Sequence, residues 1–170
     1  MPTSDPLISV SDLAAQIDRP DVRVLDASWF PPGHPQAASG GRAAFEAAHI
    51  PGAQFFDLED IADTTSALPH MAPSPEKLSS RLRSLGIGDG ADIVVYDCSG
   101  IFSAARVWWT LRLMGKTEVR VLDGGLPAWV AAGHATEDGP APWRGERHVT
   151  ARLRTDVVAS LADERRAVDG

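Results

Sequence analysis

Residues 93–103 read IVVYDCSGIFS, and a helix-length amphipathic run follows from Ser103. The first four residues are β-branched or aromatic, which is typical of a short buried strand. The strand leads into a polar, glycine-containing loop and then directly into the helix, so the segment predicts a βα unit. Loops at the carboxyl ends of parallel strands face a common crevice. We therefore expect a binding or catalytic site of this chain to include residues 97–103.

Strand-like and helix-like runs alternate along the rest of the chain. Besides Asp92–Tyr96, short runs rich in β-branched or aromatic residues predict strands at Val22–Ala27, Gln54–Phe56 and Glu118–Leu122. Helices are predicted from Ser11 to about Ile17, over Arg42–Ala48, from the Ser74 cap and Pro75 to Gly86, over Ser103–Met114, and from the Asp123-Gly124-Gly125 turn to Ala132. This alternation predicts an α/β fold built around a small, mostly parallel sheet.

The composition describes an ordinary globular chain. Its 170 residues are 44% hydrophobic and carry a net charge of −7, with a pI near 5.1. The apolar fraction suffices for a buried core, and the negative charge argues against nucleic acid and membrane surfaces as partners. No uncharged apolar stretch reaches the roughly 18 residues that a membrane-spanning helix needs. Residues 1–10 lack a basic segment followed by an apolar run, so they predict no secretory signal, and we expect a cytoplasmic location.

Cys98 is the only cysteine of the chain. A single cysteine forms neither an intramolecular disulfide nor a structural zinc or iron–sulfur site, which leaves packing or chemistry as its role. Backbone amides of the loop, beside a helix N-terminus, would cradle an anion and lower the thiol pKa from about 8.5. The neighbouring Asp97 opposes thiolate formation, and a lone cysteine is often a small buried hydrophobe. In a cysteine-phosphatase loop, an arginine that follows the cysteine after five intervening residues holds the phosphate. That position is Ala104 here, which excludes a phosphatase-type site at Cys98.

Six short motifs occur in an order that resembles a known family. They are His49-Ile50-Pro51-Gly52-Ala53, Phe55-Phe56-Asp57, Leu68-Pro69-His70-Met71, Val95-Tyr96-Asp97 with Gly100, Ser103-Ala104-Ala105-Arg106-Val107-Trp108-Trp109, and Leu122-Asp123-Gly124-Gly125-Leu126 with Trp129. With these motifs the chain resembles the N-terminal half of the tandem rhodaneses, the thiosulfate and 3-mercaptopyruvate sulfurtransferases. The resemblance implies a rhodanese-like α/β domain with helices on both faces of its sheet, and two such domains that share one cleft.

The resemblance also implies where sulfur is carried. In this family the sulfur-carrying cysteine lies in the second domain, and the corresponding position of the first-domain loop falls here on Asp97, with Cys98 one residue later. A carboxylate cannot carry a persulfide, so we expect no catalytic residue in this chain, with Cys98 as the alternative sulfur carrier. Two arginines that hold the substrate's anionic group in family members lie beyond the point where this sequence ends. We therefore expect the chain alone to be inactive in sulfur transfer.

Three residues are expected to contact a small sulfur-containing anion: His49, Ser99 and Gly100. His49 matches a histidine that the family places near the substrate, whereas the acidic residue nine positions earlier in many members is Gly40 here. The alternative for His49 is a turn-stabilising imidazole bonded to nearby backbone. Arg106 either faces the cleft or forms an ion pair with a carboxylate on its own helix. We expect the ion pair. Core packing is expected for Trp108, Trp109 and Trp129, and loop packing for His70-Met71.

No metal site and no cofactor are expected. Asp57, Glu59, Asp60 and Asp63 are close in sequence, but they lack the glycine and the terminal glutamate of a calcium loop and predict a solvated acidic face. The histidines of the chain show no metal-ligand spacing.

The sequence predicts three parts. Residues 1–138 form the rhodanese-like domain, and Gly139-Pro140-Ala141-Pro142 opens a linker over residues 139–155, because proline stiffens it and no periodic pattern surrounds it. Residues 156–170 resemble the opening of a second, truncated copy, in which Thr155 caps a helix over Asp156–Val168. A frayed C-terminal helix is the alternative.

Two functions remain open at this point. The first is one half of a sulfurtransferase, whose partner is a second rhodanese-like domain or a partner protein that supplies the catalytic cysteine. The second is a stand-alone, non-catalytic module that binds an anion or a partner. An apolar patch near the loop ends would favour the first function, and a uniformly charged surface there would favour the second.

Overall fold

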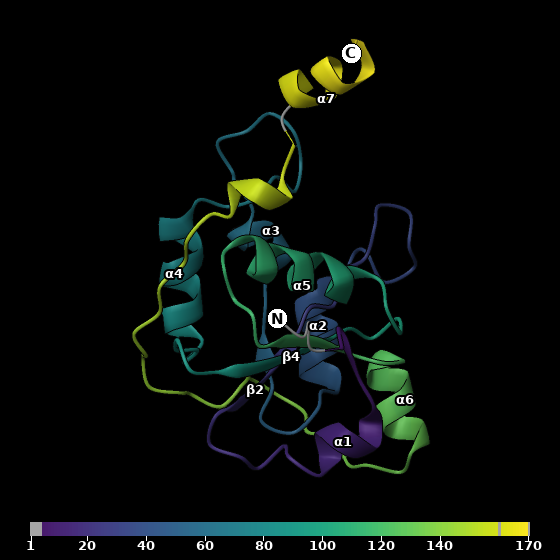
Figure 1. Cartoon of the computed structure of the whole chain (residues 1–170). Coiled ribbons are helices and arrows are strands. Elements are labelled where there is room, and N and C mark those ends of the chain that lie inside the picture. The colour runs from purple at the N-terminus through teal and green to yellow at the C-terminus, as the bar shows by residue number, and fades with distance from the viewer. Residues whose placement is uncertain (1–4, 160, 170) are drawn as a thin grey trace.

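Five parallel strands form the sheet at the centre of the molecule (Figure 1). The structure is a computed structural model that describes residues 5–159 and 161–169. The strands are β1 (Leu7–Ile8), β2 (Val22–Asp26), β3 (Gln54–Phe55), β4 (Asp92–Tyr96) and β5 (Val119–Leu122), in the order β1-β5-β4-β2-β3. The predicted parallel α/β fold is confirmed, and β4, which leads into the 97–103 loop, lies in the middle of the sheet.

Helices cover both faces of the sheet, as predicted. One buried cluster packs α3 (Leu58–Ile61), α4 (Pro75–Ser84) and α5 (Ser103–Leu113) against one face, and a second packs α1 (Val10–Ala14), α2 (Gly40–Ala47) and α6 (Gly125–Ala131) against the other. The alternation of side chains along β4 divides the two: Ile93 and Val95 belong to the first cluster, Val94 and Tyr96 to the second. A strand buried on both faces explains the unbroken apolar run of its sequence.

Several helix ends follow the predicted chemistry. Ser74 caps α4 by accepting from the backbone N–H of Lys77, and Pro75 occupies the first helical turn. Gly86 and Gly115 follow α4 and α5 with φ of +69° and +85°, the left-handed conformation that ends a helix. These four signals depend only on neighbouring residues, which is why the sequence predicts them.

Other elements differ from the prediction. Strand β1 was not predicted, because two residues carry no periodic pattern. Helix α1 is capped by Ser9, whose hydroxyl accepts from the Asp12 N–H at 3.1 Å, and not by Ser11. Helix α2 begins at Gly40, two residues before the predicted start. Helix α3 was also missed, since its single turn is shorter than any periodicity window.

The segment 139–155, here called the strap, lies against the domain. Val149 is buried in the cluster that contains α4 and α5, and the Arg152 and Arg154 N–H groups donate to the carbonyls of Met114 and Leu113 at the end of α5. The strap therefore satisfies carbonyls that the helix itself leaves without partners. The division of the chain at residues 138 and 155 remains a prediction.

The predicted helix over Asp156–Val168 is wrong in its extent. A 3₁₀ turn (Thr155–Val157) is followed by Val158 in extended conformation, and α7 (Leu161–Asp169) begins only after that. Val157 and Val158 are β-branched, which lowers their preference for a helix. In Figure 1, α7 stands away from the body of the molecule, and its residues 163–168 are exposed. Within the described residues, no helix has the length and apolar character that crossing a membrane requires.

Candidate functional site

The carboxylate of Asp97 fills the loop between β4 and α5. Its side chain is 1% exposed; Oδ1 accepts from the Ser99 N–H at 2.9 Å, and Oδ2 accepts from the N–H groups of Phe102 at 2.7 Å and Ala104 at 2.9 Å. Two of these amides open α5, where donors lack intrahelical partners and the helix dipole favours negative charge. The amide cradle that the sequence predicts is therefore present, and an acid of the chain itself occupies it.

The start of α6 holds this loop from the other side. The Leu126 N–H donates to the Asp97 carbonyl at 3.0 Å. Gly125 has a φ of +57°, and a Cβ atom there would lie 2.4 Å from the Asp97 carbonyl oxygen and 2.5 Å from that of Gly100. Only glycine permits this approach, which gives the Gly124-Gly125 pair of the sequence a structural role. The loop is thus fixed by backbone contacts as well as by the Asp97 carboxylate.

Cys98 lies beside this cradle and is poorly suited to act as a nucleophile. Its N–H donates to Ser28 Oγ at 3.0 Å. The pKa of the Cys98 thiol is raised, first by burial and further by the carboxylates of Asp26 and Asp97. Because the thiolate is the reactive form, a raised pKa lowers the fraction of Cys98 that is ready to react. Ser99 and Gly100 share the loop with Cys98, so the structure brings these three predicted residues together.

Asp26 is a second buried carboxyl at this edge of the sheet, and the sequence analysis missed it. It ends β2 directly opposite Tyr96 in the register and is 1% exposed. Oδ1 accepts from the Ser28 N–H at 2.7 Å, while Oδ2 has no hydrogen-bond partner in the described part of the chain. Burial raises the pKa of Asp26. The sequence could have indicated Asp26 as a site residue, because Asp26 lies at the carboxyl end of a predicted strand, as Asp97 does.

His49 is placed differently from the loop residues. Its ring is 1% exposed and stacks on Phe45 with centroids 4.0 Å apart; Nδ1 bonds to the Phe45 carbonyl at 2.8 Å, and Nε2 lies 3.8 Å from Glu137 Oε2. These contacts agree with the turn-stabilising interpretation. No hydrogen bond, ion pair or ring contact among the described residues joins His49 to residues 97–103, and its contact with substrate remains a prediction.

A cavity of about 360 Å³ opens next to the loop. The loops after β2 and β4, helix α3, the segment before α4 and helix α5 supply its lining residues, which are Trp29, Leu58, Pro69, His70, Met71, Phe102, Ser103 and Arg106. The Trp29 and His70 rings meet edge to face at 5.0 Å, and Trp29 stacks on Phe102 at 6.3 Å. The sequence analysis assigned no site role to these rings, because they come from segments far apart in the chain.

Arg106 lines the same cavity. Its guanidinium donates to the His70 carbonyl and lies over the Trp109 ring, 4.9 Å from its centroid. The expected pairing with a carboxylate on its own helix is wrong, because α5 contains no acidic residue. Ser103 Oγ is buried without a hydrogen-bond partner among the residues described. The cavity thus combines aromatic walls with a cation and a free hydroxyl.

Apolar side chains near the cavity face solvent. The exposed fractions are 63% for Leu68, 43% for Met71, 45% for Ile101 and 53% for Phe102. Trp129 is buried as predicted, while Trp108 and Trp109 are partly buried against the core. An apolar surface at the carboxyl edge of the sheet is the feature that the sequence analysis associates with a second domain.

The acidic residues near α3 have individual structural contacts. Asp57 caps α3 by accepting from the Asp60 N–H, Asp60 pairs with Arg81 at 2.9 Å, and Asp63 accepts from Thr65. Within the described ranges, no three His, Cys, Asp or Glu side chains are grouped so that they could hold a metal ion.

Comparisons with known proteins place this geometry in a family. Residues 9–132 match the model of the Rhodanese-like domain. The chain is 47% identical over 159 residues to an Arabidopsis thaliana thiosulfate/3-mercaptopyruvate sulfurtransferase, covering 94% of this chain and 40% of the relative. It is 41% identical over 151 residues to the Escherichia coli 3-mercaptopyruvate sulfurtransferase, covering 89% of this chain and 53% of the relative. A crystal structure of the E. coli 3-mercaptopyruvate sulfurtransferase superposes with a TM-score of 0.90 and 34% identity over 98% of this chain and 62% of that chain. The chain thus spans about half the length of these curated relatives.

Proposed function

Because this chain belongs to the rhodanese-like family, we propose that it forms the non-catalytic N-terminal half of a sulfurtransferase. The coverage of its relatives supports this proposal, since this chain aligns with only 40–53% of them. The names of those relatives suggest thiosulfate or 3-mercaptopyruvate as sulfur donor. A second rhodanese-like domain, on a longer chain or a partner protein, then supplies the catalytic cysteine.

The proposed reaction passes one sulfur atom through that cysteine. Its thiolate attacks the outer sulfur of thiosulfate, a new S–S bond forms, the S–S bond of thiosulfate breaks, and sulfite leaves with the electron pair. A thiol or cyanide then attacks the terminal sulfur of the persulfide and releases the thiolate. With mercaptopyruvate, the C–S bond breaks instead, and the carbon takes up a proton to give pyruvate.

The observation that carries the proposal is the occupied cradle at Asp97. A carboxylate oxygen has no sulfur to form a persulfide, and its three hydrogen bonds use the amides that would stabilise a thiolate. Cys98 lies next to the cradle, and its thiol has a raised pKa. The loop of this half therefore serves as a rigid wall and not as a reactive group.

The cavity beside the loop is the proposed contribution of this half to a shared cleft. Trp29, Phe102 and Arg106 line it, and the exposed side chains of Leu68 and Met71 surround it. An apolar rim favours a docked domain over a free charged surface. A guanidinium in this wall would attract the anionic group of a sulfur donor.

Mass spectrometry after incubation with a donor tests the proposal. The purified chain is incubated with thiosulfate or 3-mercaptopyruvate, and turnover is assayed with cyanide or a thiol. We expect no stable adduct of one sulfur atom and no turnover, in the wild type and in Cys98→Ser alike. An adduct or turnover that Cys98→Ser abolishes would make Cys98 the sulfur carrier and overturn the proposal. Sequencing downstream of the Gly170 codon adds a second test, since we expect a strand followed by a cysteine-glycine loop.

A further inference from the structure

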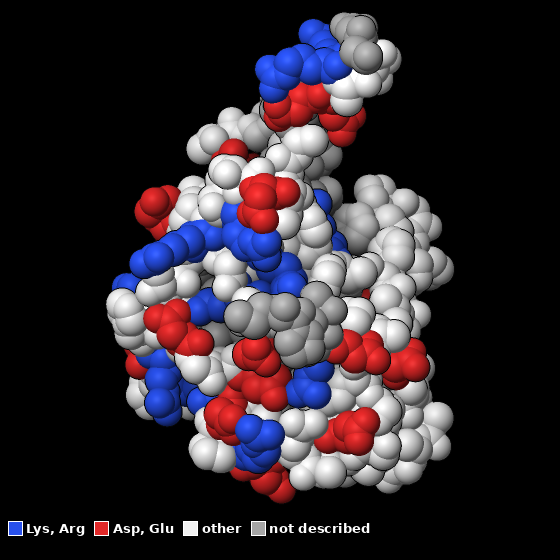
Figure 2. All heavy atoms as spheres, viewed as in Figure 1, with Lys and Arg blue, Asp and Glu red and all other residues white. Residues whose placement is uncertain are grey.

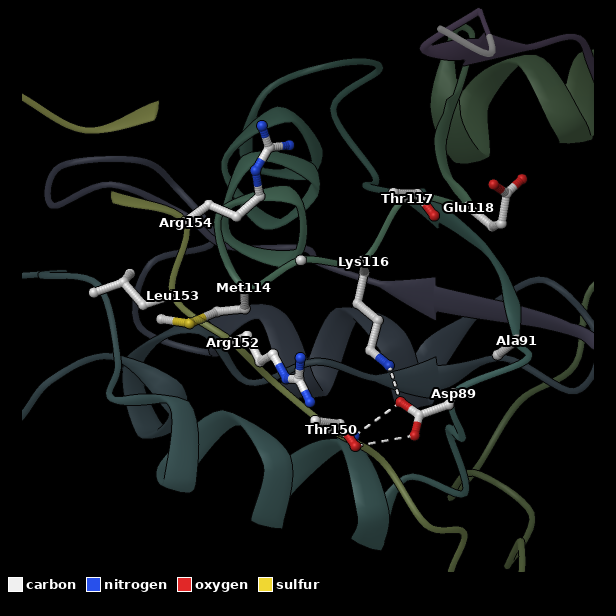
Figure 3. Close-up of a pocket in the computed structure, with 11 residues that line it drawn as sticks. Asp89, Ala91, Met114, Lys116, Thr117, Glu118, Thr150, Arg152, Leu153 and Arg154 are labelled. Atoms are coloured by element: carbon white, nitrogen blue, oxygen red, sulfur yellow. Dashed lines mark hydrogen bonds and ion pairs between the residues drawn. The ribbon is translucent and has the colours of Figure 1, made fainter. Parts of the chain in front are cut away.

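A second cavity, of about 460 Å³, lies at the opposite edge of the sheet (Figure 3). It is formed where β4 and β5 begin, between the end of α5 and the strap. Its lining residues are Asp89, Ala91, Met114, Gly115, Lys116, Thr117, Glu118, Thr150, Arg152, Leu153 and Arg154. On the face shown in Figure 2, Lys and Arg side chains gather over the end of α5 and the neighbouring strap, although the chain as a whole is acidic.

Lys116 is a buried cation with unused donors. Its side chain is 9% exposed, and Nζ donates to Asp89 Oδ1 at 2.7 Å. An ammonium group has three N–H donors, so two remain for other partners. In Figure 3, Lys116 and Arg152 extend toward the same space beside Thr150. The guanidinium of Arg152 makes no hydrogen bond or ion pair with any residue that the structure describes.

The other charges around the cavity do not neutralise Arg152. The Asp89 oxygens accept from Lys116 and from Thr150, whose N–H and Oγ1 lie at 2.8 and 3.1 Å. Arg154 pairs with Asp156 at 2.7 Å, outside the cavity. The end of α5 carries about half a negative charge, and strap amides already cap its last carbonyls. Glu118 also lines the cavity, but in Figure 3 its carboxylate points away from Lys116 and Arg152. The positive charge of Arg152 therefore lies beside the buried Lys116 without a carboxylate partner among the described residues.

We propose that this cavity binds a small organic phosphomonoester. Lys116 and Arg152 supply charge-assisted donors from two directions, which suits the terminal oxygens of a tetrahedral phosphate. The cavity also has an apolar side, formed by Met114 and Leu153, for the organic part of the ligand. This inference is independent of the proposed sulfur chemistry, because the cavity lies at the other edge of the sheet.

The experiment is a calorimetric titration of the chain with phenyl phosphate, inorganic phosphate and phenol at constant ionic strength. Two or three charge-assisted hydrogen bonds correspond to a dissociation constant on the order of 1 mM for phenyl phosphate. Inorganic phosphate should bind more weakly because it leaves the apolar side empty, and phenol should not bind measurably. Arg152→Gln should weaken phenyl phosphate binding about tenfold, since one charged donor is lost.

Arg147→Gln is the matched control. Arg147 is an exposed arginine of the same strap, and it does not line the cavity. Its substitution removes the same charge and should leave the affinity unchanged. Lys116→Met should abolish binding, provided that its circular dichroism spectrum matches the wild type. Absence of saturable binding would overturn the proposal. An equal loss of affinity in Arg152→Gln and Arg147→Gln would also overturn it, because the binding would then reflect general charge attraction.

Discussion

Replacing Asp97 by alanine should destabilise the domain strongly. The substitution removes the acceptor of three backbone N–H groups, those of Ser99, Phe102 and Ala104, at a position that is 1% exposed. Ala104 is itself fully buried, so water has little access to its orphaned amide. The first turn of α5 would lose its cap at the same time.

The expected magnitude comes from these three contacts. A hydrogen bond to a charged group contributes about 1.5–3 kcal/mol, but neighbouring bonds share one carboxylate and do not add in full. A lost N-cap alone costs about 0.5–2 kcal/mol. We therefore expect the free energy of unfolding to fall by about 3–5 kcal/mol in Asp97→Ala. With a urea m-value near 2 kcal/mol/M, the midpoint falls by roughly 1.5–2.5 M.

Urea denaturation at pH 7, followed by circular dichroism, measures this difference. Asp123→Ala is the matched control, because Asp123 follows the end of β5 in the same way but is exposed and has no side-chain partner in the described structure. Its effect should stay within about 0.5 kcal/mol. Asp97→Asn keeps one acceptor oxygen and should lie between the wild type and Asp97→Ala, which preserves the test if the alanine variant does not fold.

Hydrogen exchange supplies an independent measurement. In Asp97→Asn the amides of Ser99, Phe102 and Ala104 should exchange faster than in the wild type, while those of β2 should change only with global stability. If Asp97→Ala costs no more than Asp123→Ala, or if these three amides keep their protection, the carboxylate does not hold the loop and the account of the occupied cradle is refuted.

Three further predictions concern the remaining titratable groups. Lys116 and the Thr150 N–H lower the pKa of Asp89 from 3.8 to about 2, so the stabilisation by Asp89 is present above pH 3.8 and is lost as the pH falls from there through about 2. Asp89→Asn should therefore cost about 1 kcal/mol at pH 7, after allowance for its exposed carboxylate, and only a small part of that at pH 2, as measured by urea midpoints. Burial raises the pKa of Asp26 above 3.8, so the wild type loses stability as the pH rises from 3.8 through that raised value, and Asp26→Asn should be relatively more stable at pH 7 than at pH 3. The raised pKa of Cys98 predicts that iodoacetamide alkylates it more slowly at pH 8 than it alkylates free cysteine, and faster alkylation would contradict its assigned environment.

Much of the fold was predictable because its signals are local. The strand β4 is a continuous apolar run, α4 has a serine cap and a proline in its first turn, and glycines end α4 and α5. Strand β1 and helix α3 carry too few residues for a periodic pattern, and their positions depend on long-range pairing, as in Leu7 with Val121. Neither could be derived from neighbouring residues alone.

The candidate site was predictable only in part. The loop at residues 97–103 follows from the topology, since a βα loop of a central parallel strand faces the carboxyl edge. The topology does not determine the orientation of the Asp97 side chain, because a carboxylate after a strand can point to solvent or turn back onto its own loop. Trp29, His70 and Phe102 belong to three separate segments, and only tertiary packing brings their rings together.

The identity of the anion in the cradle decides what the loop can do. The first amides of α5 need an acceptor whether or not chemistry takes place. If a thiolate supplied that acceptor, part of the stability of the loop would depend on a reactive group that changes during turnover. Asp97 supplies a permanent acceptor, so the hydrogen bonds of this loop do not depend on a bound ligand, and under the proposed function the loop takes no part in sulfur transfer. A fixed, unreactive loop beside an open aromatic cavity is suited to shaping a cleft whose nucleophile comes from another domain. The expected cost to stability of removing Asp97 therefore follows from the same hydrogen bonds that, under the proposed function, keep these amides from a thiolate.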